Sequence, residues 1–386
     1  MTDLLRSFDY VFPTEIRYGE NIVAELPHRI KRDGISSVLL ITDPGLKDMP
    51  FTRKILDVLK TGGVRCAVYG GVEANPKDHN VQSAAALARE KGAEALIALG
   101  GGSPMDCAKA VAILAPQGGE VRDYEDSSRI GEKILPLYTV PTTAGTGSEV
   151  TFSAVITDSR AKFKFTVKSP RIAPRAAFID PQLSVSMPSA LTAATGMDAL
   201  THAIEAFTAR NANPLSDAAA LHAVDLINSF LVRAVKTPED MEARAGMMLG
   251  SLIAGIAFSH SDVASVHCLA EALGGMYDSP HGVCNAVALP VVMEYNLEYA
   301  LDLYARIARV MGIAFESSEE GARRAVERVK FLAVEVGLPR FSELGIRESD
   351  FPVLAEKSAQ NGSNRDNPRP MKSEDYLELL KILQRG

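Results

Sequence analysis

The chain has 386 residues, 46% of them hydrophobic and 23% charged, which is enough for two domains with a core each. Its formal net charge of -7 argues against a nucleic-acid partner or an anionic membrane. The longest nearly apolar run, residues 246–258, is too short to span a bilayer, and residues 1–13 lack the basic-then-apolar layout of a secretion signal. We therefore expect a cytoplasmic protein whose four scattered cysteines form no disulfides.

Short apolar runs alternate with helix-like segments in the first half of the chain. Strands are expected at 37–42, 64–71 and 94–102, and helices at 51–63, 78–93 and 103–115. Alternation of this kind predicts a parallel sheet that is covered by helices on both faces.

Asp43 ends the first of these strands, in the stretch LLITDPG. In a nucleotide-binding fold, an acidic residue at this place accepts hydrogen bonds from the ribose hydroxyls and repels a 2′-phosphate. This interpretation favours NAD(H) over NADP(H). The alternative is an ordinary turn aspartate before Pro44 and Gly45.

Three glycines, Gly100 to Gly102, lie between the third expected strand and the helix after it. Ser103 is a plausible N-cap and Pro104 then takes the favoured first helical position. Glycines at such a turn let the backbone approach a phosphate, and the helix start offers free N–H groups. The stretch does not match the G-x-G-x-x-G fingerprint, so a plain strand–helix turn remains the alternative.

A second cluster of threonine, serine and glycine, TVPTTAGTGSEVT, spans residues 139–151. Its hydroxyl groups and flexible backbone suit phosphate and ribose contacts, and its length weakens the alternative of a plain polar loop. Residues 134–180 are rich in β-formers, whereas the chain from Met187 onward is almost wholly helical. We therefore expect an α/β domain over residues 1–187 and a helical domain over residues 188–386.

The stretch GMDALTHAIEAF begins the helical half. On a helix, Asp198, His202 and Glu205 share one side and the apolar residues share the other. Asp198 and His202 are four residues apart, so their side chains are neighbours. Taken alone, such a pair is most simply explained as the solvated face of an amphipathic helix.

A further stretch, HCLAEALGGMYDSPHG, changes that weighing. If residues 260–273 form one helix, His260, His267 and Glu271 share a face, and His281 follows in a loop that can swing back toward it. One carboxylate and three imidazoles suit Fe²⁺ or Zn²⁺ better than Mg²⁺ or Ca²⁺. An open coordination position would bind a substrate oxygen. The nearby Cys268 and Cys284 are either soft ligands or, as we favour, buried apolar filler.

These motifs together resemble the iron-containing (group III) alcohol dehydrogenases, in order and over nearly the whole chain. The stretches that carry the resemblance are GGGSPMDCAKA, TTAGTGSEVT, ATGMDALTHAIEAF and PHGVCNAVALP. The resemblance implies an N-terminal dinucleotide-binding α/β domain, a C-terminal helical domain, an active site in the cleft between them, and a homodimer or larger homo-oligomer. It implies a metal held by Asp198, His202, His267 and His281. It implies a cofactor site lined by Asn75, Gly101, Gly102, Ser103, Asp106, Thr142, Thr143, Thr146 and Lys164, with Leu183 at the adenosine end.

The sequence departs from the family pattern at several places. Many members have a proton-relay histidine four residues after the third metal ligand, where this chain has Glu271. His260 and Asp262 stand where relatives usually have small or amide residues, and Val292 stands where many have histidine. These changes leave the class of reaction intact but put the usual substrate and the usual proton relay in doubt.

The resulting expectation is reversible hydride transfer between NAD(H) and a small alcohol or aldehyde whose oxygen is held by the metal. The catalytic candidates are Glu271, His281 and His260, the first two for proton transfer and the last, with Phe258, for the substrate pocket. Two alternatives are a metal- and NAD-dependent lyase of the dehydroquinate synthase type and a nucleotide-binding protein without catalysis. Short primary alcohols, a diol, lactaldehyde or a charged small aldehyde are all compatible with the motifs.

Overall fold

The computed structural model describes residues 5–386; residues 1–4, which begin the segment that lacks the layout of a secretion signal, lie outside the described residues. The chain divides into two compact units. One contains residues 11–143 and 148–186, and the other contains residues 5–10, 144–147 and 187–386. The sequence pattern placed 5–10 and 144–147 with the α/β half, but both segments pack within the helical unit. Residues 144–147 approach the helical backbone closely: a Cβ atom on Gly147 would lie 2.6 Å from the Cα of Gly255.

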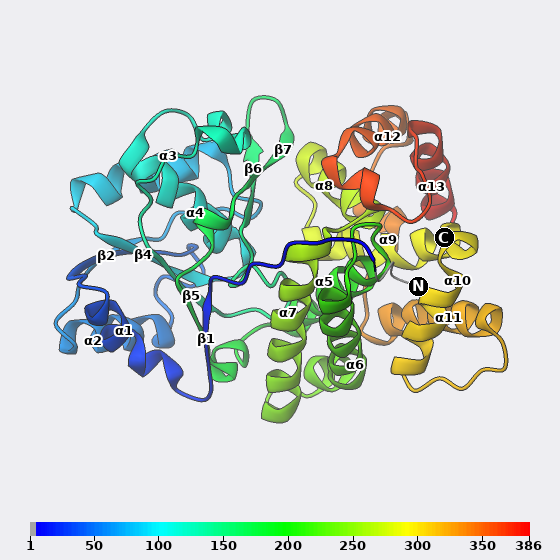
Figure 1. Cartoon of the computed structure of the whole chain (residues 1–386), viewed down its shortest axis with the longest axis horizontal. Coiled ribbons are helices and arrows are strands. Elements are labelled where there is room, and N and C mark those ends of the chain that lie inside the picture. The colour runs from blue at the N-terminus through cyan, green and yellow to red at the C-terminus, as the bar shows by residue number, and fades with distance from the viewer. Residues whose placement is uncertain (1–4) are drawn as a thin grey trace. The chain divides into compact units, whose positions relative to one another are not determined.

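A six-stranded sheet forms the centre of the α/β unit (Figure 1). In spatial order its strands are β1 (Glu15–Tyr18), β8 (Ala176–Ile179), β5 (Leu137–Pro141), β4 (Ala95–Gly100), β2 (Ser37–Ile41) and β3 (Arg65–Tyr69). All neighbouring strands run parallel, which confirms the predicted parallel sheet. The edge strand β1 was not expected from the sequence.

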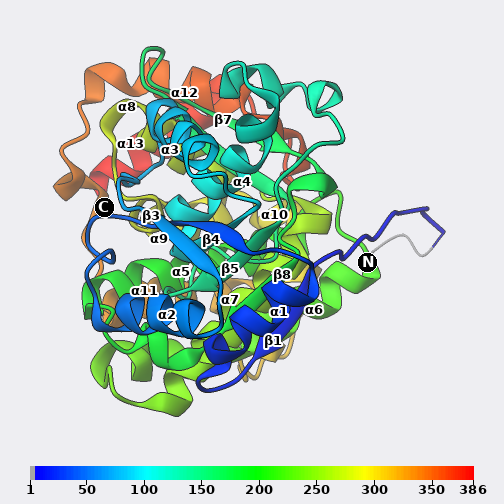
Figure 2. The same cartoon turned by 90° about the vertical axis from the view of Figure 1, so that its left-hand side faces the viewer.

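Helices cover both faces of this sheet (Figure 2). The helices α1 (Leu26–Arg32) and α2 (Pro50–Thr61) lie on one face, and α3 (Asp78–Glu90) and α4 (Gly102–Gln117) lie on the other. In β2, Leu40 belongs to the core beneath the first pair of helices and Leu39 to the core beneath the second. Because both faces are buried, β2 is an unbroken apolar run, and each such leucine contributes about 1.5–3 kcal/mol.

A separate antiparallel pair of strands, β6 (Ser153–Asp158) and β7 (Phe163–Lys168), completes the α/β unit. Thr157 of β6 lies opposite Lys164 of β7 and also forms a bridge with Lys77. The hairpin is therefore joined to the segment before α3, which carries Asn75.

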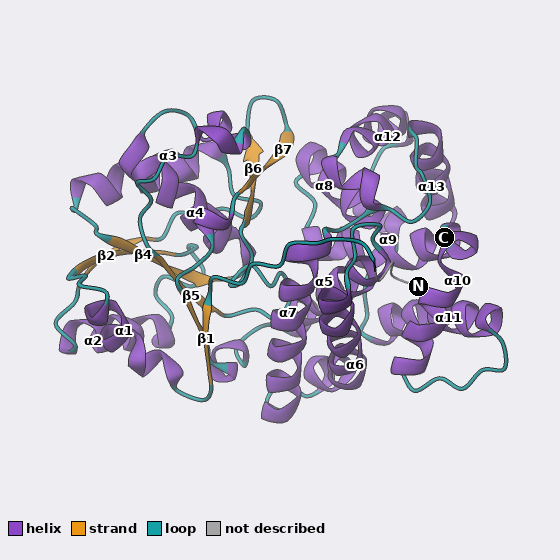
Figure 3. Cartoon of the chain, in the orientation of Figure 1, coloured by secondary structure: helices purple, strands orange, loops and turns teal. Residues whose placement is uncertain are grey.

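The described part of the chain after β8 contains helices but no strands (Figure 3). The α-helices are α5 (Ser189–Thr208), α6 (Pro214–Lys236), α7 (Met241–Ser261), α8 (Ser265–Tyr277), α9 (His281–Tyr295), α10 (Leu297–Val310), α11 (Ser318–Glu335), α12 (Phe351–Gln360) and α13 (Ser373–Arg385). This confirms the predicted α/β half followed by a helical half. By length and composition α6 and α7 could cross a membrane, but both pack against α5 and against each other, as core helices do.

α5 is the central helix of this unit. It packs against α6, α7 and α9, and every residue from Gly196 to Thr208 is buried. Asp198, His202 and Glu205 are therefore not on a solvated face, and the simple amphipathic explanation of this helix is wrong.

The expected helix over residues 260–273 is interrupted. α7 ends at Ser261, and Asp262 takes φ 69° and ψ 179°, a backbone conformation that side-chain-bearing residues rarely adopt. His260 therefore does not share a helical face with His267 and Glu271, contrary to the sequence prediction. His281 likewise lies not in a loop but at the first position of α9.

A buried lysine fastens α4 to the segment before β6. The fully buried Nζ of Lys109 donates hydrogen bonds to Ser148 Oγ and Thr151 Oγ1, both at 2.7 Å, and to the backbone oxygen of Ser153 at 2.8 Å. Glu149 lies beside it and is 2% exposed. Burial raises the pKa of Glu149 to about 7 and lowers that of Lys109 to about 8, because removal from water disfavours both charged forms.

We predict that Glu149→Gln flattens the pH dependence of stability. The folded protein holds the Glu149 proton more tightly than the unfolded chain does, so the wild type loses stability as the pH rises from about 4.5 to about 7. The loss approaches about 3 kcal/mol, and the glutamine variant escapes it. Thermal midpoints measured across this range should fall less for Glu149→Gln than for the wild type. The exposed control Glu132→Gln should follow the wild type, and parallel curves for Glu149→Gln and wild type would contradict the buried titration.

Candidate functional site

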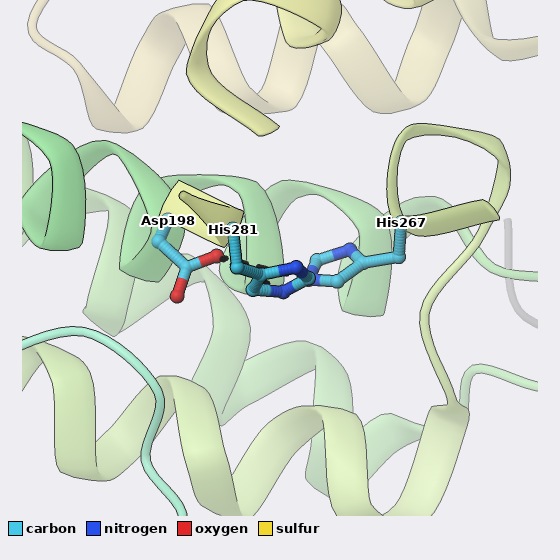
Figure 4. A group of neighbouring side chains, drawn as sticks. All are labelled: Asp198, His267 and His281. Atoms are coloured by element: carbon cyan, nitrogen blue, oxygen red, sulfur yellow. Dashed lines mark ion pairs between the residues drawn. The ribbon is translucent and has the colours of Figure 1, made fainter. Parts of the chain in front are cut away.

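Three side chains of the helical unit, Asp198, His267 and His281, point toward one another (Figure 4). One ligand atom from each lies within 4.8 Å of the other two. The Nε2 atoms of His267 and His281 lie 3.9 Å and 3.7 Å from Oδ1 of Asp198. One carboxylate oxygen and two imidazole nitrogens form a set of donors that suits a divalent transition metal.

Each of these side chains comes from a different helix. Asp198 lies in α5, His267 lies in the first turn of α8, and His281 begins α9. The second residue of α9 is Gly282, where a Cβ atom would lie 2.6 Å from the backbone oxygen of Ala194 in α5. The missing side chain therefore lets α9 approach α5 closely enough for His281 to reach Asp198.

His202, the fourth expected ligand, follows Asp198 by one turn of α5. Its Nδ1 lies 4.0 Å from Oδ2 of Asp198, and its ring centroid lies 4.4 Å from that of His267 and 4.3 Å from that of Phe258. This Nδ1 is buried and makes no hydrogen bond within residues 5–386. Burial lowers the pKa of His202 to about 4, so the ring is neutral and keeps a lone pair for a metal.

Asn285, one turn after His281 on α9, occupies the middle of this group. Its Nδ2 lies 2.6 Å from Asp198 Oδ1 and 3.1 Å from the Nε2 atoms of both His267 and His281. An amide nitrogen has two hydrogens and so cannot satisfy three acceptors at once. The crowding of a carboxylate oxygen and two imidazole nitrogens around one amide fits a bound cation, which makes this a suitable metal site.

In both Asp198 and His267, neighbouring groups outweigh the effect of burial on the pKa. Burial raises the pKa of Asp198, but the neighbouring imidazoles and the Asn285 amide outweigh it and hold that pKa below its ordinary value. Burial lowers the pKa of His267, but the hydrogen bond and charge of Glu205 outweigh it and raise that pKa above its ordinary value. The carboxylate of Asp198 is therefore ionised over the physiological range.

Glu205 is a site residue that the sequence analysis did not assign. It lies on the same side of α5 as Asp198 and His202, and one of its oxygens lies 2.6 Å from Nδ1 of His267. The available signal was its helical spacing from the two expected ligands. Asn285 was also missed, and its signal was its position four residues after His281.

Glu271 lies one turn beyond His267 on α8 and is half-buried. Its Oε2 accepts a hydrogen bond of 2.6 Å from Nδ2 of Asn361. The structure thus holds this carboxylate in place, on the same helix as one expected metal ligand. A proton-relay role for Glu271 stays a prediction.

His260 lies apart from the acid–histidine cluster, in the last turn of α7. Its ring stacks on Tyr10, with centroids 3.7 Å apart and an interplanar angle of 12°, and its Nδ1 lies 2.9 Å from the backbone oxygen of Ile256. Because α7 ends before α8 begins, His260 does not share a helical face with His267, which was the basis for expecting it at the site. A catalytic role for His260 stays a prediction.

The glycine turn of the α/β unit starts α4 two residues earlier than the sequence suggested. Gly101, not Ser103, is the N-cap, because Gly101 is extended and the helix begins at Gly102. Ser103 and Pro104 then lie within the first turn, where helical N–H groups have no helical acceptor. A Cβ atom on Gly101 would lie 3.0 Å from Thr143 Oγ1, so a side chain here would crowd Thr143.

Thr142 and Thr143 lie beside this turn because β5 pairs with β4 in parallel. Pro141 lies opposite Gly100, and the N–H of Thr142 donates to the backbone oxygen of Gly100 at 3.0 Å. The open N–H groups of the helix start and the neighbouring threonines fit a dinucleotide pyrophosphate.

Asn75 and Lys164 are brought together although 89 positions separate them: Lys164 Nζ donates to Asn75 Oδ1 at 2.7 Å. Asn75 is buried and takes φ 49°, a left-handed conformation that asparagine tolerates better than most residues. The pair carries an amide and a cation, which suit the polar parts of a nucleotide.

Two acidic candidates are already engaged within the fold. Asp106 accepts from Ser148 Oγ at 2.7 Å and from the N–H of Val155 at 3.0 Å, which ties α4 to β6. Asp43 Oδ1 accepts a hydrogen bond from the N–H of Leu46 at 3.0 Å. Asp43 therefore uses this oxygen as an ordinary turn aspartate does. Within residues 5–386 no hydrogen bond to its Oδ2 is seen, which leaves this oxygen for a ribose hydroxyl.

The last two cofactor candidates lie elsewhere. Leu183 lies in the short 3₁₀ helix Pro181–Ser184 and packs in the core with α1 and α2. Thr146 belongs to the 144–147 segment of the helical unit. Cofactor contacts by Leu183 and Thr146 stay predictions.

Comparisons with known proteins give a consistent result. Residues 13–181 match the family model described as iron-containing alcohol dehydrogenase, and residues 192–383 match the model for the C-terminal part of the same family. The chain is 39% identical over 381 residues to a 1,3-propanediol dehydrogenase of Klebsiella pneumoniae, covering 97% of this chain and 98% of that protein. It is 35% identical over 376 residues to an NAD-dependent methanol dehydrogenase of Bacillus methanolicus, covering 97% and 99%.

A solved structure of 1,3-propanediol oxidoreductase superposes with a TM-score of 0.93 at 39% identity. The match covers 98% of this chain and 100% of that one.

We predict that Gly282→Ala weakens metal binding. The added methyl group would collide with the backbone of α5 and push α9, with His281, away from Asp198. Zn²⁺ affinity, measured by competition with a chelator, should fall about 10-fold or more, as when the partners that orient a metal ligand are lost. Gly362→Ala is the matched control, because nothing lies within 4 Å of its added Cβ. Wild-type affinity in Gly282→Ala would show that the close approach of α9 is not needed.

Proposed function

This chain belongs to the iron-containing alcohol dehydrogenase family and is an NAD-linked alcohol dehydrogenase or aldehyde reductase, and we propose that Asp198 and three histidines hold its metal. The observation that carries the metal site is the convergence of a buried carboxylate oxygen and imidazole nitrogens on α5, α8 and α9. When bound, the metal supplies a Lewis acid for an alcohol or aldehyde oxygen, and NAD(H) supplies or accepts the hydride.

We propose Fe²⁺ as the resident metal, with Zn²⁺ as the alternative. The family description supports iron. The ligands, one carboxylate and the imidazoles of His202, His267 and His281, accept either ion. Neutral imidazoles are needed for binding, and the low pKa of His202 keeps its ring neutral at physiological pH.

The surrounding side chains exclude water and hold the ligands in place. Phe258 covers one face of the His202 ring, with the ring planes 16° apart. Asn285 donates to the Asp198 carboxylate. Dry surroundings strengthen every charge interaction in the site.

The cofactor is proposed to bind the α/β unit through its pyrophosphate at the start of α4. The backbone N–H groups of Gly101, Gly102 and Ser103 supply donors, and Asp43 Oδ2 supplies an acceptor for a ribose hydroxyl. A carboxylate at this place would repel a 2′-phosphate, which supports NAD(H) over NADP(H). Asn75 and Lys164 supply a second polar contact.

The substrate proposed is a short alcohol or aldehyde, and a compound with a second polar group, such as a diol, is the first choice. The relative that acts on 1,3-propanediol supports this choice. His260 and Asp262, which depart from the family pattern, were the sequence signal for a polar substrate, and this role stays a prediction.

We further propose a homodimer or larger homo-oligomer in the cytoplasm. Leu5, Phe8, Val11 and Phe12, which are large apolar side chains near the N-terminus, are exposed and suit contact with a second copy. None of the four cysteines, all of which lie within residues 5–386, is in a disulfide, as suits a reducing compartment.

The first test is turnover of NADH with a panel of small aldehydes, on metal-stripped protein and after anaerobic addition of Fe²⁺ or Zn²⁺. We expect activity only after metal is restored, and best with a short polar aldehyde. Asp198→Asn keeps the shape of the ligand but removes its charge, so added metal should not restore its activity. Tight NADH binding without turnover of any aldehyde would favour the lyase or the non-catalytic alternative.

A second prediction concerns Glu271. If its carboxylate passes the proton to and from the substrate oxygen, Glu271→Gln should lower kcat by about 10²–10⁴-fold and remove one limb of its pH profile. Asn361→Ala, which removes the partner of Glu271 but keeps the carboxylate, should retain a shifted profile with a smaller loss. The relay is refuted if Glu271→Gln keeps full activity with an unchanged pH profile.

A further inference from the structure

We propose that Glu205 is a positioning residue: from α5 it holds the His267 ring and the start of α8 so that His267 presents an unprotonated Nε2 to the metal. The inference rests on the metal site of the proposed function. It assigns a role to a buried carboxylate that is not itself one of the expected ligands.

Glu205 is 3% exposed and receives donors from three places on one segment. Its Oε2 accepts from the N–H of Ala264 at 2.9 Å and lies 2.6 Å from Nδ1 of His267, and its Oε1 accepts from the N–H of Val266 at 2.7 Å. Two backbone groups and one imidazole thus share two oxygens. A carboxylate suits this arrangement because both of its oxygens accept hydrogen bonds.

The contact with Nδ1 decides where the His267 proton lies. A carboxylate oxygen accepts but does not donate, so the proton belongs on Nδ1 and the lone pair belongs on Nε2. Nε2 is the atom that faces the Asp198 carboxylate, at 3.9 Å from Oδ1. Glu205 therefore sets both the tautomer and the ring orientation that metal binding needs.

The same carboxylate also supports the turn between α7 and α8. Asp262 holds a rare backbone conformation, which persists only where its surroundings enforce it. On one side, Ser363 Oγ donates to Asp262 Oδ1 at 2.9 Å; on the other, Glu205 holds the N–H groups of Ala264 and Val266. His267 follows this turn directly, so the turn and the ligand are placed together.

The test compares Zn²⁺ affinity of the full-length protein, by chelator competition, in wild type, Glu205→Gln and Glu205→Met. Glutamine offers one acceptor oxygen and no charge, so at least one of the three donors loses its partner. Methionine offers none, and the His267 proton is no longer held on Nδ1. We expect affinity to fall about 10–100-fold in Glu205→Gln and at least as much in Glu205→Met.

A matched control separates positioning from helix capping. Asn213 caps α6 in the same unit and accepts from the N–H groups of Leu215 and Ser216, both at 3.1 Å. Asn213→Ala should lower the thermal midpoint and leave Zn²⁺ affinity unchanged. In ¹⁵N-histidine spectra of the metal-free protein, His267 should be the Nδ1–H tautomer in the wild type and should gain the Nε2–H form in Glu205→Met.

The outcomes are distinct. Wild-type Zn²⁺ affinity in Glu205→Gln would overturn the positioning role while leaving the metal site standing. Failure of the wild type itself to bind Zn²⁺ would overturn the proposed metal site and, with it, this inference. If Glu205→Met does not fold, Glu205→Gln decides the question.

Discussion

Polar groups that are packed together away from water are costly unless each finds a partner, and the helical unit gathers the ligand atoms of Asp198, His267 and His281 within 4.8 Å of one another. A single amide, from Asn285, lies among a carboxylate oxygen and two imidazole nitrogens. The packing of the helices keeps these groups close. α5 is buried from Gly196 to Thr208, and α9 approaches it closely at Gly282, which has no side chain. The metal that we propose would bind these groups together. The packing of α5, α8 and α9 holds them in place for it.

The sequence predicted the features that depend on local pattern. Buried strands such as β2 appear as unbroken apolar runs because helices cover both faces of the sheet. The helix that carries Asp198 and His202 was expected from their spacing, although the burial of every residue from Gly196 to Thr208 was not. That face resembles an amphipathic surface in sequence, and only the packing of neighbouring helices shows that it is interior.

The remaining features depend on contacts between distant parts of the chain. Asp262 interrupts the helix without being glycine or proline, so no ordinary breaker marks the turn. α4 has its N-cap at Gly101, two residues before the expected Ser103. Both oxygens of Asp106 join α4 to neighbouring segments, as Lys109 does, and its expected contact with the cofactor stays a prediction. In the stretch GGGSPMDCAKA, the glycines form the proposed cofactor site, whereas Asp106 and Lys109 fasten α4 to neighbouring segments.

The short segment 144–147 has a consequence for how the chain reaches its native state. It leaves the α/β unit, packs within the helical unit against Gly255 of α7, and returns to the α/β unit at Ser148. During synthesis, this segment leaves the ribosome well before α7 does, so its native partners do not yet exist. The packing of residues 144–147 is therefore completed only after α7 has been made, even if the rest of the α/β unit folds first. If the chain were cut between residues 186 and 187, the C-terminal fragment would lack residues 144–147, which pack within the helical unit.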